Sequence, residues 1–221
     1  NYMKTPPFSS FLPGISGEMG IPIWCFYVNR GQAIASFGIR DKDHSIMEFY
    51  PAHQSYQLTN TLGFRTFVKL DGKIYEPFQN PEEEHWMYIG SNELEIEEKN
   101  EKFKIKMNVL YYTLPEESIG ALVRVLTLTN EDRIPKNLEI LDGMPSILPY
   151  GVNLEQMKMM GQTIKAWMQT ETIKKGIPYY KVRFSTKDSA VVQPVDGGNF
   201  YLTVEEDGNV LPCILDSTTI F

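Results

Sequence analysis

Hydrophobic and polar residues alternate along the first two thirds of the chain, and this pattern predicts β-strands. From Phe103 to Tyr111 every second residue is apolar, and the positions between them begin with lysine, lysine and asparagine. A period of two is typical of a strand with one buried face. Residues 93–97 alternate glutamate with leucine and isoleucine, and the polar stretch 98–101 separates the two runs. We therefore expect a hairpin with a turn at 98–101 and a solvated acidic face.

Other stretches extend this pattern. Residues 121–128 are read as apolar on both faces, as expected for a strand inside a sheet that is covered on both sides. Further strands are expected at 23–28, 32–39, 62–70, 73–76, 138–141, 179–185, 200–204 and 210–215. Short turns such as Asp71-Gly72 join most of them, and crossover helices are missing. The simplest fold class that accommodates these strands is all-β, with an antiparallel sandwich of two large sheets.

One helix is predicted to interrupt the strands. Its apolar stripe, with spacings of three and four, consists of Leu154, Met157, Gly161, Ile164 and Met168. Asn153 is a suitable N-cap, and the helix is expected to end near residues 170–172. No internal repeat or linker stands out, so residues 1–221 are interpreted as one domain.

Composition and charge narrow the function classes. The 221 residues carry a formal net charge of -7 and a pI of about 5.1, which disfavours nucleic acid and anionic membranes as partners. No apolar run is long enough to span a bilayer, and two cysteines are too few for a disulfide framework, so we expect a soluble cytoplasmic protein. Because the chain starts at Asn1 and ends in the apolar residues 218–221, it is interpreted as part of a longer polypeptide.

Few residues suggest catalysis. His44, His53 and His85 lack metal-site spacing with a second histidine or a cysteine, so no metal site is predicted. His53 and His85 are candidate general bases, although a single histidine near strands is commonly a structural polar residue. Motifs for phosphate cradles and serine nucleophiles are missing from the sequence. The glutamate runs at 82–84 and 93–98 are interpreted as exposed charge.

A polar loop and several aromatic residues are candidates for substrate binding. The loop, of mixed charge and placed directly after an apolar strand, consists of Arg40, Asp41, Lys42, Asp43 and His44. Its alternative interpretation is a solvated, salt-bridged turn. Aromatic rings that stack on sugars are the second possibility, and the candidates are Trp24, Tyr27, Trp86, Tyr88, Tyr150 and Trp167. Trp24, Tyr27 and Trp167 are expected in the core, whereas Trp86 and Tyr88 are expected to be exposed; Trp86 joins the loop as a candidate site residue.

Several segments resemble the N-terminal region of glycoside hydrolase family 94, formerly glycosyltransferase family 36. They read PGISGEMG at 13–20, WCFYVNRG at 24–31 and FGIRDKDHSIMEF at 37–49, followed by 63–67, 123–130 and 138–140. The sequence is most similar to the 1,2-β-oligoglucan phosphorylase branch, with the phosphorylase-like region of cyclic β-1,2-glucan synthases as a more distant relative.

The resemblance implies a galactose-mutarotase-like β-supersandwich that precedes a helical linker and a catalytic (α/α)6 barrel outside this chain. Enzymes of this family are commonly homodimers. They cleave a β-glucosidic bond with inorganic phosphate and release α-glucose 1-phosphate with inversion, without a metal or organic cofactor. The general acid and the phosphate-binding residues belong to the barrel, so the resemblance transfers no catalytic residue to this chain.

The leading interpretation is therefore a non-catalytic N-terminal module of a glycoside phosphorylase, a hexosyltransferase acting on β-1,2-glucooligosaccharides. Its expected partners are a β-glucan oligosaccharide, the helical barrel of the same polypeptide and a second subunit. Two alternatives are a stand-alone carbohydrate-binding sandwich and an aldose-epimerase-like enzyme that uses His53 or His85.

Overall fold

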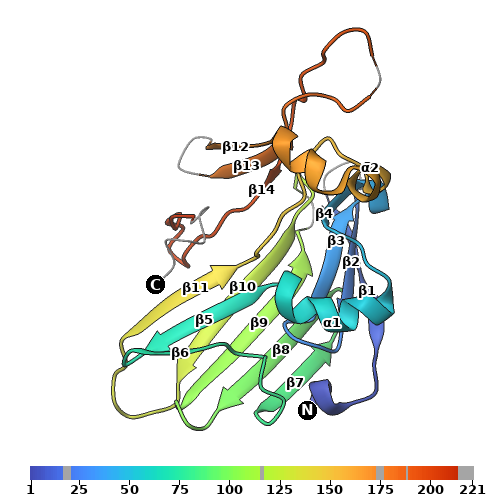
Figure 1. Cartoon of the computed structure of the whole chain (residues 1–221). Helices are drawn as coiled ribbons and strands as arrows, with labels where there is room; N and C mark the ends of the chain where they lie inside the picture. Colours follow the sequence, from blue (N-terminus) through green and yellow to red (C-terminus); the bar gives the residue numbers. More distant parts are fainter. Residues whose placement is uncertain (17–20, 115–116, 173–176, 188, 214–221) are drawn as a thin grey trace. The chain divides into compact units, whose positions relative to one another are not determined.

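The computed structural model describes residues 1–16, 21–114, 117–172, 177–187 and 189–213 (Figure 1). They form two compact units, unit 1 over Asn1–Ser146 and unit 2 over Ile147–Phe221, which are described separately. Strands make up 43% of the structure and helices 15%, and the strands pair in antiparallel sheets. The all-β antiparallel fold predicted from the alternation is confirmed. Among the described residues, no helix combines the length and the apolar character needed to cross a membrane.

The first sheet of unit 1 has four antiparallel strands in chain order. They are β1 (Ser9–Ser16), β2 (Ile21–Val28), β3 (Ile34–Ile39) and β4 (Ser45–Met47). One row across this sheet joins Leu12, Cys25, Phe37 and Met47, all of them buried. Because successive side chains on a strand point to opposite faces, this row marks the face that packs into the core.

The second sheet contains the predicted hairpin. Its order is β10 (Leu122–Asn130), β9 (Ile105–Thr113), β8 (Glu93–Asn100) and β7 (Glu84–Ile89). The expected turn at 98–101 is wrong in position, because β8 continues until Asn100 pairs with Ile105. Glu98 therefore lies within a strand, on the same buried face as Leu94 and Ile96, and not in an exposed acidic cluster.

A third, smaller sheet covers part of the second. Its strands are β11 (Leu138–Gly143), β5 (Arg65–Leu70) and β6 (Lys73–Tyr75), in that order (Figure 1). Asp71 and Gly72 form the predicted tight turn, with φ of 50° and 74°. Positive φ at both positions suits the right-handed twist of the two flanking strands.

The first and second sheets approach each other closely at Gly14. A Cβ built on Gly14 would lie 2.2 Å from the Thr113 hydroxyl oxygen, so only glycine fits between β1 and β9. Tyr111 on β9 donates a hydrogen bond of 2.9 Å to the backbone oxygen of Gln32, in the turn between β2 and β3. The buried face of β7–β10 thus packs against both other sheets of unit 1.

Unit 1 also holds a helix that the pattern does not predict, α1 (Ala52–Leu62), next to β2 and β3. Its sequence, AHQSYQLTNTL, has no apolar stripe, and its buried side chains are those of Ser55 and Thr59. The helix closes with the Gly63 N–H donating to the Thr59 backbone oxygen at 3.1 Å. Two short 3-10 helices are η1 (Tyr2–Lys4) and η2 (Lys42–His44).

Unit 2 contains the predicted helix in a shorter form. The helix α2 (Leu154–Met160) begins at the predicted N-cap, Asn153, which forms a capping box with Gln156. It does not reach residues 170–172, because Gly161 has a φ of 47° and ends the α-helical turns. A 3-10 helix, η3 (Gly161–Trp167), and a strand, β12 (Met168–Thr172), follow instead.

The sheet of unit 2 is small. Strand β13 (Pro178–Val182) lies between β12 and β14 (Asn199–Phe200). The strands expected at 200–204 and 210–215 are reduced to the end of β14 and an isolated bridge between Val204 and Val210. Residues 214–215 of the latter strand and the apolar segment 218–221 lie outside the described residues.

Candidate functional site

The predicted binding loop is an ordered turn between β3 and β4. Asp41 caps the 3-10 helix η2: its Oδ1 accepts a hydrogen bond of 2.9 Å from the Asp43 N–H and lies 2.8 Å from His44 Nδ1. Trp24 Nε1 donates to the Asp41 backbone oxygen at 2.9 Å. Arg40 enters the turn with a φ of 65°. All five predicted loop residues, including Lys42, are exposed.

Hydrogen bonding also sets the charge state of this turn. The hydrogen bond with His44, together with the Asp43 backbone N–H, lowers the pKa of the Asp41 carboxyl. A charged Asp41 therefore fixes the backbone of the loop. This geometry matches the salt-bridged turn that was the alternative interpretation, and it leaves the side chains of Arg40 and Lys42 facing solvent.

Trp86 does not join this loop. It lies on β7 in a different sheet, where it pairs with Glu97 of β8, while the loop follows β3 of the first sheet. Tyr88 is 50% exposed, as predicted, whereas Trp86 is half-buried and so less exposed than predicted. The structure therefore separates the six candidate residues into a turn and a sheet face.

The aromatic residues expected in the core behave differently from one another. Tyr27 is buried, as predicted, whereas Trp24 is half-buried, with its indole N–H on the Asp41 backbone oxygen. Trp167 is 43% exposed, so its assignment to the core is wrong. The cause is Gly161, because the α-helix ends there and the apolar stripe does not continue to Trp167.

Trp86 and Tyr88 belong to the solvent-facing side of the second sheet. We call this side the outer face, defined by Trp86, Tyr88, Glu95, Glu97, Lys106, Asn108 and Tyr112. Asn108 Nδ2 donates to Glu95 Oε1 at 2.7 Å and to Glu97 Oε2 at 2.8 Å. Lys106 Nζ lies 2.8 Å from the same Glu97 oxygen. These bonds hold two carboxylates in fixed orientations beside the aromatic rings.

The opposite side of the same sheet carries a buried, hydrogen-bonded pair of a histidine and a glutamate. His85 Nε2 lies 2.8 Å from Glu98 Oε2, and the two side chains are 0% and 1% exposed. Glu98 also accepts hydrogen bonds from the Tyr75 hydroxyl at 2.7 Å and from the Phe78 backbone N–H. Because the carboxylate accepts from every side, the His85 Nε2 carries a proton directed at Glu98. His85 Nδ1 is buried without a hydrogen-bond partner among the described residues.

Two tyrosines next to this pair are held in the neutral form. Burial, followed by the charge of Glu98, raises the pKa of Tyr75 far above its ordinary value. Burial also raises the pKa of Tyr2, whose ring meets the His85 ring edge-on at 5.9 Å. Enclosed in this way, His85 has no surface from which to act on a substrate as a general base.

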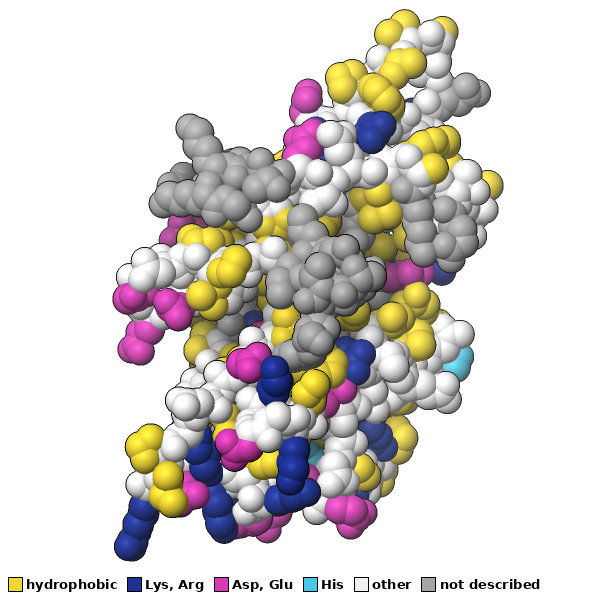
Figure 2. Space-filling view, turned by 60° about the vertical axis from the view of Figure 1, so that its left-hand side comes forward, with side chains coloured by type: hydrophobic (Ala, Val, Ile, Leu, Met, Phe, Trp, Pro, Cys, Tyr) yellow, Lys and Arg dark blue, Asp and Glu magenta, His cyan; other side chains and the backbone are white. Residues whose placement is uncertain are grey.

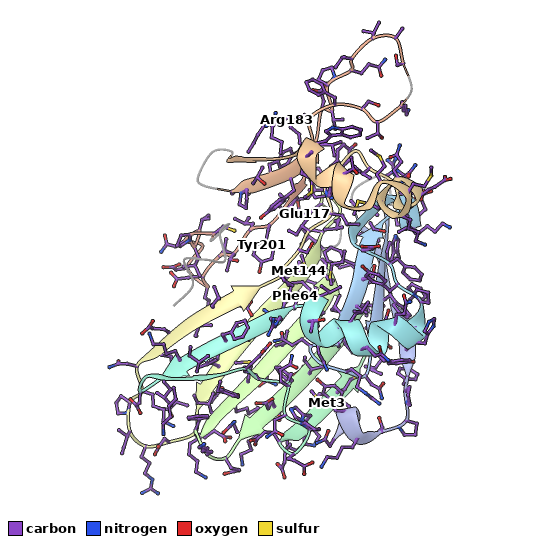
Figure 3. All side chains as sticks on the ribbon, in the orientation of Figure 1. Met3, Phe64, Glu117, Met144, Arg183 and Tyr201 are labelled. Carbon is purple, nitrogen blue, oxygen red and sulfur yellow. The ribbon has the colours of Figure 1, made fainter. Side chains whose placement is uncertain are left out.

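A buried charged cluster around Arg124 was not predicted from the sequence. Arg124 on β10 forms an ion pair with Asp142 on β11, and its side chain is 7% exposed. Its Nη2 donates to Gln32 Oε1 at 2.6 Å and to Thr66 Oγ1 at 3.1 Å. The guanidinium lies 5.2 Å from the centre of the Phe64 ring, which Figure 3 labels next to β5.

The Arg124 cluster joins all three sheets of unit 1. The sequence signal that could have revealed this cluster is Arg124 itself, because it is the one charged residue in 121–128, a run interpreted as apolar on both faces. Tyr111, also in contact, has its pKa raised by burial and lowered in part by Arg124. The cluster thus stabilises the packing of the sheets by fixed hydrogen bonds.

A shallow hollow lies at the hairpin ends of unit 1. It is lined by Lys99, Glu101, Lys104, Glu131, Asp132, Arg133 and Ile134. Figure 2 shows basic and acidic side chains interspersed over the lower part of the molecule, where these turns lie in Figure 1. Hydrogen bonds from Lys104 and Lys99 lower the pKa of Glu101 to about 2. Because charges of both signs pair within the hollow, it offers no net charge that would select an ion.

The remaining candidates add no catalytic cluster. His53 is exposed in the first turn of α1. Both cysteines are free; Cys25 is buried, and burial raises the pKa of its thiol. Within the part of the chain that the structure describes, no three residues among histidine, cysteine, aspartate and glutamate are placed to hold a metal ion.

Comparison with known proteins found no matching protein-family model and no matching curated protein.

Proposed function

We propose that this chain is a non-catalytic N-terminal β-sandwich module of a glycoside phosphorylase. The complete enzyme would phosphorolyse β-1,2-glucooligosaccharides to α-glucose 1-phosphate with inversion, using inorganic phosphate as co-substrate. Its catalytic residues would lie in a helical barrel of the same polypeptide. A homodimer in the cytoplasm is part of the same proposal, which rests on the family resemblance of the sequence together with the antiparallel fold.

The observation that carries the non-catalytic role is the burial of two pairs of titratable side chains. His85–Glu98 and Arg124–Asp142 are the pairs closest to acid–base or anion-binding chemistry, and their side chains are between 0% and 18% exposed. Both join strands inside unit 1 instead of facing a cleft. Groups that are buried and hydrogen-bonded in this way stabilise a scaffold and do not reach a substrate.

The exposed turn at Arg40–His44 favours an auxiliary role for this module, next to an active site formed by another domain. Its backbone is fixed by Asp41, while the side chains of Arg40 and Lys42 are accessible. A rigid scaffold that presents a short polar turn is suited to contribute to the rim of a site built elsewhere.

Phosphorolysis assays test this proposal. The substrates are β-1,2-glucooligosaccharides with inorganic phosphate, and the product measured is α-glucose 1-phosphate. We expect product from the polypeptide that also carries the barrel and none from the 221 residues alone. Turnover by the 221-residue chain, or failure of the barrel-bearing polypeptide to use any β-glucan with phosphate, would contradict the proposal.

The outer face favours a second candidate function, a carbohydrate-binding sandwich that acts without a barrel. Exposed Tyr88 and half-buried Trp86 provide rings beside fixed carboxylates. Phosphorolysis by the barrel-bearing polypeptide separates the two functions, because a binding module that acts without a barrel gives no phosphate-dependent product. The aldose-epimerase alternative is weakened by the complete burial of His85.

A further inference from the structure

The outer face combines two kinds of group in a regular array. Across the sheet, Trp86 is in register with Glu97 and Asn108, and the next outward row places Tyr88 beside Glu95. Neighbouring strands are ~4.8 Å apart and alternate residues on one strand ~6.7 Å apart. Aromatic rings on β7 therefore stand directly beside hydrogen-bonding groups on β8 and β9.

The aromatic groups are accessible. Tyr88 is 50% exposed, Trp86 is half-buried, and Tyr112 lies further along the same face on β9, half-buried. Aromatic side chains of this kind provide a large apolar surface with a polar edge, which matches the C–H faces and hydroxyl rims of pyranose rings. On an edge strand, these rings are reachable by a ligand that lies across the sheet.

The polar groups are oriented before any ligand arrives. Asn108 donates both of its bonds to Glu95 Oε1 and Glu97 Oε2, and Lys106 binds the latter oxygen as well. Among the described residues, no further hydrogen bond engages Glu95 Oε2 or Glu97 Oε1. These oxygens are acceptors for the hydroxyl groups of a ligand, and charge-assisted hydrogen bonds of this type are stronger than neutral ones.

The charge of the face limits what can occupy it. Glu84, Glu93 and Lys99 lie on the same side of the sheet as the residues that define the outer face. With Glu95, Glu97 and Lys106, this side of β7, β8 and β9 carries four glutamates and two lysines. Excess negative charge repels phosphates and nucleic acids. A twofold pairing with a second copy would bring the same acidic surfaces together, which disfavours a homodimer through this face. A neutral oligosaccharide carries no negative charge, so the acidic residues of this face do not repel it.

We infer that the outer face is a binding surface for a neutral oligosaccharide, with rings of Trp86 and Tyr88 stacking on sugar units and Glu95 and Glu97 accepting their hydroxyl hydrogens. The choice of a β-glucan as the first ligand to test rests on the proposed function. The inference that this face binds an oligosaccharide does not, because it is drawn from the strand register and the contacts of the face. It would hold a glucan chain at a place separate from the turn at 40–44.

The test is titration of the complete 221-residue chain by calorimetry with β-1,2-, β-1,3- and β-1,4-glucooligosaccharides. We expect saturable binding to at least one series. Trp86→Ala and Tyr88→Ala should each weaken that binding about fivefold to tenfold, the loss expected for one stacked ring. Tyr88→Phe, which keeps the ring, should bind within about twofold of the original chain, and Glu95→Gln should weaken binding.

Matched controls lie elsewhere in unit 1. Phe11→Ala removes a ring that is 52% exposed on β1, and Glu139→Gln changes an exposed carboxylate on β11; neither should alter sugar binding. Thermal unfolding of each variant verifies that the fold is intact. NMR shift changes on adding the oligosaccharide should map to β7, β8 and β9.

The inference would be overturned by a lack of saturable binding to any series, or by Trp86→Ala and Tyr88→Ala variants that bind as tightly as the original chain. NMR shift changes confined to other strands would also overturn it. A concentration-dependent dimer that Tyr88→Ala abolishes, without sugar binding, would assign the face to a second copy and overturn it as well. Binding here together with no phosphorolysis by the barrel-bearing polypeptide would refute the proposed function alone, so the two failures are distinguishable.

Discussion

Glu98 and His85 face each other across adjacent strands, with Glu98 Oε2 2.8 Å from His85 Nε2 and neither side chain exposed by more than 1%. The carboxylate accepts further hydrogen bonds from the Tyr75 hydroxyl and the Phe78 backbone N–H. One acidic residue therefore satisfies three donors between two sheets, and its removal leaves the buried His85 Nε2 and the buried Phe78 N–H without this acceptor.

Glu98→Ala is expected to reduce the free energy of unfolding by about 3–5 kcal/mol, because breaking a buried pair leaves the partner groups uncompensated. Urea denaturation followed by fluorescence measures the change. The control is Glu93→Ala, an exposed position at the start of the same strand, where a loss below about 1 kcal/mol is expected. Similar losses for the two variants would show that Glu98 contributes no more than a surface carboxylate.

Arg124→Lys is expected to reduce stability by about 2 kcal/mol or more, since lysine keeps the charge but not the planar set of donors that reaches Asp142, Gln32 and Thr66. Chemical denaturation provides the measurement. Arg133→Lys, at an exposed position, is the matched control and should be neutral. An unchanged midpoint for Arg124→Lys would mean that charge alone is sufficient at this position.

Stability should fall at alkaline pH. Burial raises the pKa values of Tyr2, Tyr75 and Tyr111 above the ordinary value of 10.0 in the folded chain. Above that pH the unfolded chain loses tyrosine protons that the folded chain keeps, so it binds fewer protons and is favoured as pH rises. The stabilisation is complete below about pH 10 and is lost as pH increases toward the folded-state values.

Thermal unfolding between pH 8 and 11 measures this dependence, and absorbance at 295 nm follows the ionisation of the tyrosines. Tyr75→Phe should flatten the decline, whereas Tyr88→Phe on the exposed face should leave its slope unchanged. A melting temperature that stays constant across this range would contradict the assignment of the raised pKa values to burial.

Asp41→Ala tests the turn between β3 and β4. We expect little change in melting temperature, because the side chain is exposed, and a weaker phosphorolysis activity in the polypeptide that carries the barrel. Asp207→Ala, in an exposed turn of unit 2, is the control. Equal activity of Asp41→Ala and the original polypeptide would remove the loop from the proposed function.

Strands with one buried face were predictable because their alternation is local. The hairpin of β8 and β9 follows directly from the apolar positions between Leu94 and Tyr111. Helix α1 was not predictable in this way, since its buried side chains are Ser55 and Thr59 and no apolar stripe marks it. The end of α2 depended on the positive φ of Gly161, which a spacing pattern does not reveal.

The candidate site was likewise predictable only where a local pattern marks it. The exposure of Tyr88 followed from its place after an acidic loop, whereas Trp86 is half-buried. The bonds from Asn108 to Glu95 and Glu97 depend on strand register, which the local pattern does not give. Glu98 was interpreted as exposed because charged residues seldom lie inside a protein unless paired. Its partner, His85, is thirteen positions away and becomes a neighbour through the pairing of β7 with β8.

Asn1 and Tyr2 cover one side of the buried His85–Glu98 pair. The Tyr2 ring lies against His85, its hydroxyl donates to the Gly31 backbone oxygen at 2.5 Å, and Asn1 Nδ2 donates to the backbone oxygens of Pro81 and Glu83. Loss of the Tyr2 ring would therefore admit water to the His85–Glu98 pair in the protein interior.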